Sequence, residues 1–136
     1  MAINKATPAP IDGDVKVVVA NNSRQLEKFR QGGWAVLSAG DPTGLPTGIF
    51  NLAHASKASA NVYPQTYGGP VVHVDQDHVY QVGAKGVVEH SRGLFATPPV
   101  IGRNYEVKYS RGMGQVLGEI SQAAGAKIEQ SRGRSL

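Results

Sequence analysis

Short apolar runs separated by polar and turn residues dominate the chain, and most show the two-residue alternation of β-strands. The run VKVVVA at 15–20 is dense in β-branched residues and predicts a strand that is buried on at least one face. From residue 71 onward, the pattern predicts a meander in which VVHV, HVYQV and VVEH are strands joined by the turns DQD and GAKG. RNYEVKY and QVLGEI predict a further hairpin around the turn SRGMG.

The segment NNSRQLEKFRQGG at 21–33 has a different pattern, which we interpret as a short helix. Asn22 is a suitable N-cap, and Gln25 three residues later completes a capping box. Leu26 and Phe29 would share one helical face, and the Gly-Gly pair at 32–33 would end the helix. WAVLSA at 34–39 and IFNLAHA at 49–55 then predict two more strands.

These elements predict an α+β fold that is mainly β. A strand–helix–strand segment at 15–47 precedes a small, bent, SH3-like β-barrel at 48–120, and together they form one compact domain at 15–120. Residues 1–14 are rich in proline and polar residues and predict a flexible leader. Residues 121–136 predict a short helix or a basic tail.

The amino-acid composition excludes some classes of functional site. The 136 residues include 40% hydrophobic residues, enough for a core, and 17 Gly and 8 Pro, which suit many turns. No cysteine is present, which excludes disulfides, thiolate zinc sites and cysteine nucleophiles. The net charge of +4 is spread evenly, with no basic block that would mark a nucleic-acid site. The first ten residues lack the apolar run of a signal peptide, so we expect a cytoplasmic protein, with packaging in a virion as an open alternative.

The stretch VVHVDQDHVYQVG at 71–83 contains two histidines and two aspartates, side chains that can bind a metal or act in acid–base catalysis. A metal site would join His73 and His78 to His90 or Asp75, but none of the strong ligand spacings occurs. Asp75 and Asp77 lie in a predicted turn, where carboxylates accept bonds from nearby backbone N–H groups. We therefore predict that these side chains are ordinary polar residues on the surface of a hairpin. We expect no metal, no cofactor and no enzyme activity.

Tyrosines and basic residues alternate along the second half of the chain. They predict either a surface that stacks bases and contacts phosphates or the ordinary side chains of a β-rich protein. Both interpretations stay open for Tyr63, Tyr67, Tyr80, Tyr105 and Tyr109 and for Lys85, Arg92, Arg103, Lys108 and Arg111.

The segment from about Gly48 to Gly114 resembles the KfrB-type domain of plasmid-encoded proteins. The resemblance is carried by TGIFNLAHA, YGGPVVHVDQDHVYQVGAKGVVEHSRGLF and PPVIGRNYEVKYSRGMGQV, with GAKG where a typical member has GRG. It implies a small β domain that has no catalytic activity of its own and is associated with plasmid maintenance and conjugation. The residues in frame with the pattern are Gly69, Asp75, Gln81, Gly86, His90, Arg92, Gly102, Tyr109 and Gly112.

The resemblance implies that Gln81, His90, Arg92 and Tyr109 cluster on one rim as binding residues, with internal roles for His90 and Tyr109 as the alternative. Lys85, Arg103, Lys108 and Arg111 complete the candidate binding set. The leading hypothesis is a non-catalytic accessory protein of a plasmid or other mobile element that binds another protein. The alternatives are a self-assembling particle subunit and a nucleic-acid-binding module. We expect a protein partner or self-association, and no membrane.

Overall fold

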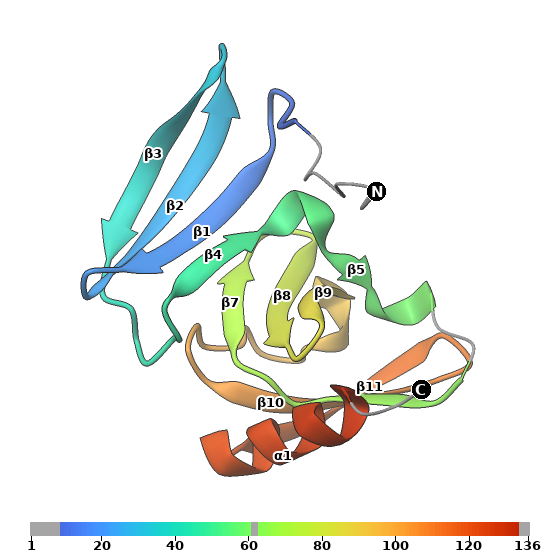
Figure 1. The fold of residues 1–136 in the computed structure, drawn as a ribbon. Coiled ribbons are helices and arrows are strands. Elements are labelled where there is room, and N and C mark those ends of the chain that lie inside the picture. Colours follow the sequence, from blue (N-terminus) through green and yellow to red (C-terminus); the bar gives the residue numbers. More distant parts are fainter. Residues whose placement is uncertain (1–8, 61–62, 134–136) are drawn as a thin grey trace, which may run out of the picture.

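The computed structural model describes residues 9–60 and 63–133, which form three β-sheets and one α-helix (Figure 1). The N-terminal sheet has the strand order β3-β2-β1-β4, formed by β1 (Val15–Ala20), β2 (Ser23–Arg30), β3 (Gly33–Gly40) and β4 (Gly48–Asn51). The central sheet has the order β5-β9-β8-β7, formed by β5 (Ser56–Lys57), β7 (Val71–Val74), β8 (His78–Gly83) and β9 (Gly86–Ser91). The C-terminal sheet has the order β11-β10-β6, formed by β6 (Gln65–Tyr67), β10 (Asn104–Ser110) and β11 (Met113–Ile120).

Residues 9–60 and 63–133 also form four helices. Three are single 3-10 turns, η1 (Leu52–His54), η2 (Ala58–Ala60) and η3 (Arg92–Leu94). The α-helix α1 (Gln122–Gly133) follows the last strand, so the chain takes the helical alternative of the two predicted for its end. Of the helices in residues 9–60 and 63–133, none is long and apolar enough to cross a membrane.

The central sheet lies between the other two sheets, with apolar residues on both of its faces (Figure 1). Val72 and Tyr80 on one face pack with Val17 and Val19 of β1. The opposite face packs against the C-terminal sheet in a cluster that contains Val71, Val79, Val88, Tyr67, Phe95, Val107 and Tyr109. Because both faces are covered, the strands at 71–90 contain apolar runs as well as simple alternation.

One continuous stretch joins the central and C-terminal sheets. After β6 pairs with β10, the chain makes an isolated bridge between Pro70 and Asn104 and continues as β7, which pairs with β8. Gly69 lies at this corner, and a Cβ built there would come within 1.7 Å of the carbonyl oxygen of Val82. A glycine is therefore required for the close approach of the corner to β8.

The helix predicted in the segment 21–33 is wrong, because Ser23–Arg30 of this segment form β2. Asn21 and Asn22 have φ of 52° and 60°, which makes them a tight two-residue hairpin turn rather than a helix cap. Leu26 pairs with Val17 on the inner face of the sheet, whereas Phe29 faces the opposite side and packs on Trp34. The three-residue spacing of these two apolar side chains thus marks the two faces of a strand.

The predicted mainly β fold is confirmed, whereas the SH3-like barrel is not. The strands of residues 9–60 and 63–133 lie in three open sheets and do not close. Of the predicted leader, residues 1–8 lie outside the described part of the chain. The backbone of Gly13 and Asp14 bonds to that of Phe29 at 2.9 and 2.8 Å, so sheet pairing begins before β1.

Helix α1 is fixed to the sheets by a buried carboxylate. Glu129 is 7% exposed, and its oxygens accept bonds from the backbone N–H groups of Gly68 at 2.7 Å and Ala84 at 3.1 Å. Arg132 forms an ion pair with Glu129, and its guanidinium lies 4.3 Å from the centre of the Tyr67 ring. One side chain of α1 thus holds both the β6–β7 corner and the β8–β9 turn.

Candidate functional site

Three of the predicted binding residues form a hydrogen-bonded chain inside the core. Nε2 of His90 lies 2.7 Å from Oε1 of Gln81, and Nδ1 lies 2.7 Å from the hydroxyl of Tyr109. The amide nitrogen of Gln81 donates to the carbonyl oxygens of Gly69 and Tyr105. Gln81, His90 and Tyr109 are at most 2% exposed, so they do not form the exposed rim that the resemblance implied.

The protonation states of the groups in this hydrogen-bonded chain follow from their hydrogen-bond partners. Because Gln81 uses its amide nitrogen on two carbonyls, its oxygen faces His90 and must receive the N–H from Nε2. Nδ1 is then the acceptor for the Tyr109 hydroxyl. Burial, with Arg132 adding to it, lowers the pKa of His90 to about 4, and burial raises the pKa of Tyr109 above its ordinary value. His90 is therefore neutral at pH 7 and joins the central sheet to the C-terminal sheet.

The remaining predicted binding residues come from different elements. Arg92 lies in η3, and its guanidinium donates to the carbonyl oxygen of Phe95 at 3.3 Å. Arg103 is exposed and pairs with Glu119 at 3.2 Å. The other three are exposed, on the β8–β9 turn, on β10 and on the β10–β11 turn: Lys85, Lys108 and Arg111.

The histidines and aspartates of residues 73–78 have separate partners. Nδ1 of His73 lies 3.1 Å from the Arg24 guanidinium, and burial together with this cation lowers the His73 pKa. One oxygen of Asp75 accepts from the backbone N–H groups of Asp77 and His78, which is the turn role predicted for a carboxylate here. Within residues 9–60 and 63–133, no three His, Asp or Glu side chains are grouped as metal ligands.

The surface that sequence reasoning missed is the free side of the N-terminal sheet. β3 is the edge of this sheet; it contains no charged residue, and Val36 and Leu37 are 55% and 45% exposed. On the sheet face that points away from the core, Ile49 is 68% exposed, and Lys16 lies 4.1 Å over the ring of Trp34. We call β3 and this outer face the β3 surface. The incorrect helix at 21–33 concealed it, because the edge position of β3 depends on β2 being a strand.

A second hairpin has the same local geometry as the one that ends in β3. The β2–β3 and β10–β11 hairpins both turn through two residues of positive φ, Gln31-Gly32 and Arg111-Gly112. In both, the register shifts by one residue on the second strand, which leaves Leu37 and Leu117 as the extra residues of the two bulges. Leu117 is 49% exposed, close to the value for Leu37, so the two leucines are a matched pair of positions.

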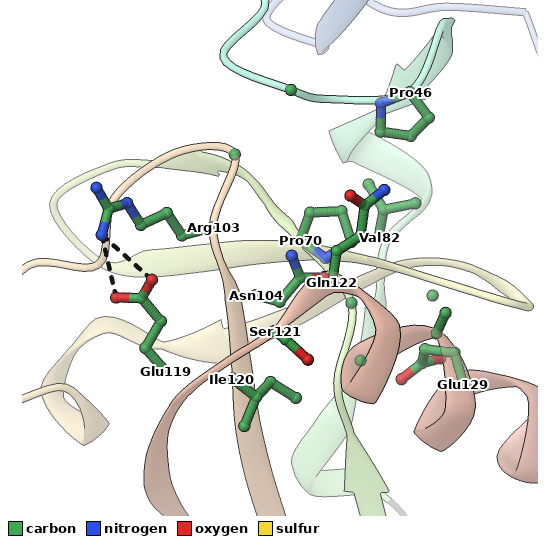
Figure 2. A pocket seen from close by; sticks show the side chains of 16 residues that line it. Pro46, Pro70, Val82, Arg103, Asn104, Glu119, Ile120, Ser121, Gln122 and Glu129 are labelled. Carbon is green, nitrogen blue, oxygen red and sulfur yellow. Dashed lines mark hydrogen bonds and ion pairs between the residues drawn. The ribbon is translucent and has the colours of Figure 1, made fainter.

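A cavity of about 520 Å³ opens beside the first turn of α1 (Figure 2). Its apolar lining includes Pro46, Pro70, Val82 and Ile120, and its polar lining includes Asn104 together with the Arg103–Glu119 pair. Ser121 caps α1, since its hydroxyl accepts from the N–H of Ala124 at 3.1 Å. The cavity therefore lies where the β3–β4 loop, β10, β11, the β6–β7 corner and α1 meet.

Two comparisons identify relatives of this chain. The family model of the KfrB Domain matches residues 66–118, which confirms the predicted resemblance but begins at β6 rather than at residue 48. Protein TraB of Escherichia coli is 48% identical over 125 residues, which cover 92% of this chain and 86% of TraB. The matched domain runs from β6 to β11, so the N-terminal sheet lies outside it. The chain belongs to the same family as Protein TraB of Escherichia coli and contains a match to the KfrB Domain at residues 66–118.

Proposed function

We propose that this protein is a non-catalytic accessory protein of a plasmid or other mobile element, and that it acts in plasmid maintenance or conjugation by binding another protein. Its membership of the same family as TraB and its match to the KfrB Domain support the plasmid setting. The internal bonding of Gln81, His90 and Tyr109 supports a structural rather than a chemical role for the polar residues of the domain.

The β3 surface is the observation that carries the binding role. An edge strand presents a row of unpaired N–H and C=O groups, and charged residues or proline normally protect such an edge from pairing. β3 has the sequence GWAVLSAG, with neither charge nor proline, and exposes Val36 and Leu37. A strand or an apolar face of a partner protein fits this surface, since edge pairing supplies backbone bonds and the leucine and valine supply apolar contact.

Deletion of the gene from its plasmid tests the proposed function. We expect plasmid retention or transfer to mating cells to fall, and the wild-type gene supplied in trans to restore it. Retention and transfer both equal to those of the intact plasmid would contradict the proposal.

Self-assembly through the same edge is a second candidate function, which the uncharged sequence of β3 favours. An antiparallel β3–β3 pair would make one continuous sheet from two copies, without opposing charges. Sedimentation at increasing protein concentration separates the two candidates. Large particles would favour a structural subunit, whereas a monomer or small oligomer would favour the accessory protein.

A further inference from the structure

The cavity beside α1 is lined by a side-chain amide that has no hydrogen-bond partner among the described residues. Asn104 is 8% exposed and lines the cavity (Figure 2). Its Oδ1 would lie 2.9 Å from a Cβ built at Gly125, so the amide lies against the first turns of α1. Among the described residues, no side-chain nitrogen or oxygen that is shielded from solvent lacks a partner, so the Asn104 amide atoms are accessible from the cavity. A group left free at the wall of a cavity is therefore available to a ligand.

Hydrogen-bond donors predominate among the uncommitted polar groups around Asn104. The first intrahelical bond of α1 is donated by Gly125 to the carbonyl of Ser121. The earlier N–H groups of Gln122 and Ala123 therefore have no intrahelical acceptor, and they lie at the positive end of the helix dipole. Of these residues, Gln122 lines the cavity together with Asn104, so its N–H and the Asn104 amide are available to an acceptor or an anion.

The two carboxylates that line the cavity are already neutralised by cations. Glu119 pairs with Arg103 at the rim, and Glu129 is bonded to Arg132 and to two backbone N–H groups. Neither carboxylate is free to hold a cationic ligand. Apart from Arg103, Asn104, Ser121 and Gln122, the rest of the lining is apolar or glycine, which suits a small hydrocarbon group.

We propose that this cavity binds a carboxylate carried on a small apolar body. The carboxylate lies against the start of α1 and the Asn104 amide, and the apolar body lies against Pro46, Pro70, Val82 and Ile120. Such a group is found on a free small carboxylic acid and at the C-terminus of a peptide that ends in an apolar residue. No residue of β3 lines this site, and the proposal does not depend on the proposed function.

The experiment is a titration of the full chain, followed by backbone amide NMR, with N-acetyl-leucine and with N-acetyl-leucinamide as the matched neutral probe. We expect saturable shifts at Asn104, Gln122 and Ala123 with the acid, and binding at least about tenfold weaker for the amide. A short peptide ending in leucine, with and without C-terminal amidation, forms the second arm. Tighter binding of the free-carboxylate peptide than of N-acetyl-leucine would identify a peptide terminus as the source, and the reverse order would identify a small acid.

Two variants with a matched control test the assigned donors. Gln122→Pro removes one N–H at the first helical position, where proline is tolerated, whereas Gln122→Ala removes the side chain and keeps the N–H. We expect N-acetyl-leucine binding to be about tenfold weaker for Gln122→Pro than for Gln122→Ala, because only the proline variant lacks the N–H. Asn104→Leu should abolish binding without lowering the thermal midpoint, because it removes a buried amide that has no internal partner.

Three results would overturn the proposal. The first is equal binding of N-acetyl-leucine and N-acetyl-leucinamide. The second is the absence of shifts at the start of α1 at every concentration up to the solubility limit of the acid. The third is a lower thermal midpoint for Asn104→Leu together with retained binding. The last result would show that Asn104 serves the fold rather than a ligand.

Discussion

At the scale of single residues, the centre of the molecule depends on one neutral histidine. His90 donates to Gln81 and accepts from Tyr109, and it also stacks on the Tyr109 ring with centroids 5.5 Å apart. Because Gln81 belongs to β8, His90 to β9 and Tyr109 to β10, the chain of bonds crosses between two sheets. A fully bonded buried network of this kind fixes the relative position of the elements that it joins.

Protonation of His90 should therefore destabilise the fold. Its folded pKa of about 4 lies below its ordinary value of 6.5, so in acid the unfolded chain takes up a proton before the folded chain does. We expect the free energy of unfolding to fall as the pH drops from about 6.5 to about 4, by roughly 3 kcal/mol from this group. Urea unfolding across this pH range measures the loss.

The control for this prediction is His90→Gln, since carboxylates also titrate in the same range. The variant should be less stable at pH 7 but should lose less stability on acidification than the wild type. Parallel pH profiles for the two proteins would show that His90 does not determine the acid sensitivity.

The residue patterns predicted only part of this arrangement. The resemblance to the KfrB-type domain grouped Gln81, His90 and Tyr109 with Arg92, and internal roles for His90 and Tyr109 were one of the two interpretations. Deciding between the interpretations required the layered packing, because only the C-terminal sheet over the central sheet buries these side chains. Glu129 was not predicted at all, since nothing in a polar C-terminal segment shows that its helix folds back onto Gly68 and Ala84.

At the scale of elements, turns determined where the prediction from sequence succeeded. The strands predicted at 71–74, 78–82, 87–90, 103–109 and 115–120 are found as β7 to β11 with ends that differ by at most two residues, because glycine or aspartate turns separate alternating runs there. The failure at 21–33 came from reading Asn22 as a helix cap. Asparagine tolerates both the cap and the left-handed conformation, so the residue alone does not distinguish a helix start from a hairpin.

Substitution at Asn22 tests this turn. Its φ of 60° disfavours a β-branched residue, so Asn22→Val should lower the free energy of unfolding by about 1–2 kcal/mol, whereas Asn22→Gly should leave it equal or raise it. Gln25→Val in the middle of β2 is the control and should be tolerated, because valine suits a strand. Chemical denaturation measures all three. Equal effects of valine at 22 and 25 would contradict a left-handed turn at 21–22.

The attachment of α1 depends on Glu129. Glu129→Ala would leave Arg132 and two backbone N–H groups without their acceptor, and should cost about 3 kcal/mol of unfolding free energy. Glu119→Ala breaks the exposed pair with Arg103 and should cost less than about 1 kcal/mol. Thermal unfolding of the two variants measures the difference, and a similar small cost for both would mean that α1 is not held by its buried carboxylate.

At the scale of the whole molecule, the three layers separate a structural core from a free surface. The central sheet is covered on both faces, and the C-terminal sheet carries α1 (Figure 1). Residues 9–60 and 63–133 cover the N-terminal sheet on one face only. The KfrB match spans the inner layers and leaves the N-terminal sheet outside. The central claim is that this outer sheet binds the partner through the β3 surface.

The most direct test compares the matched leucines of the two bulged hairpins in the plasmid assay. Leu37→Lys and Leu117→Lys are equally exposed changes at equivalent positions, so both proteins should fold with the thermal midpoint of the wild type. We predict that Leu37→Lys lowers plasmid retention or transfer at least about tenfold, while Leu117→Lys leaves both unchanged. Normal retention and transfer with Leu37→Lys, or the same loss with both variants, would contradict binding through β3.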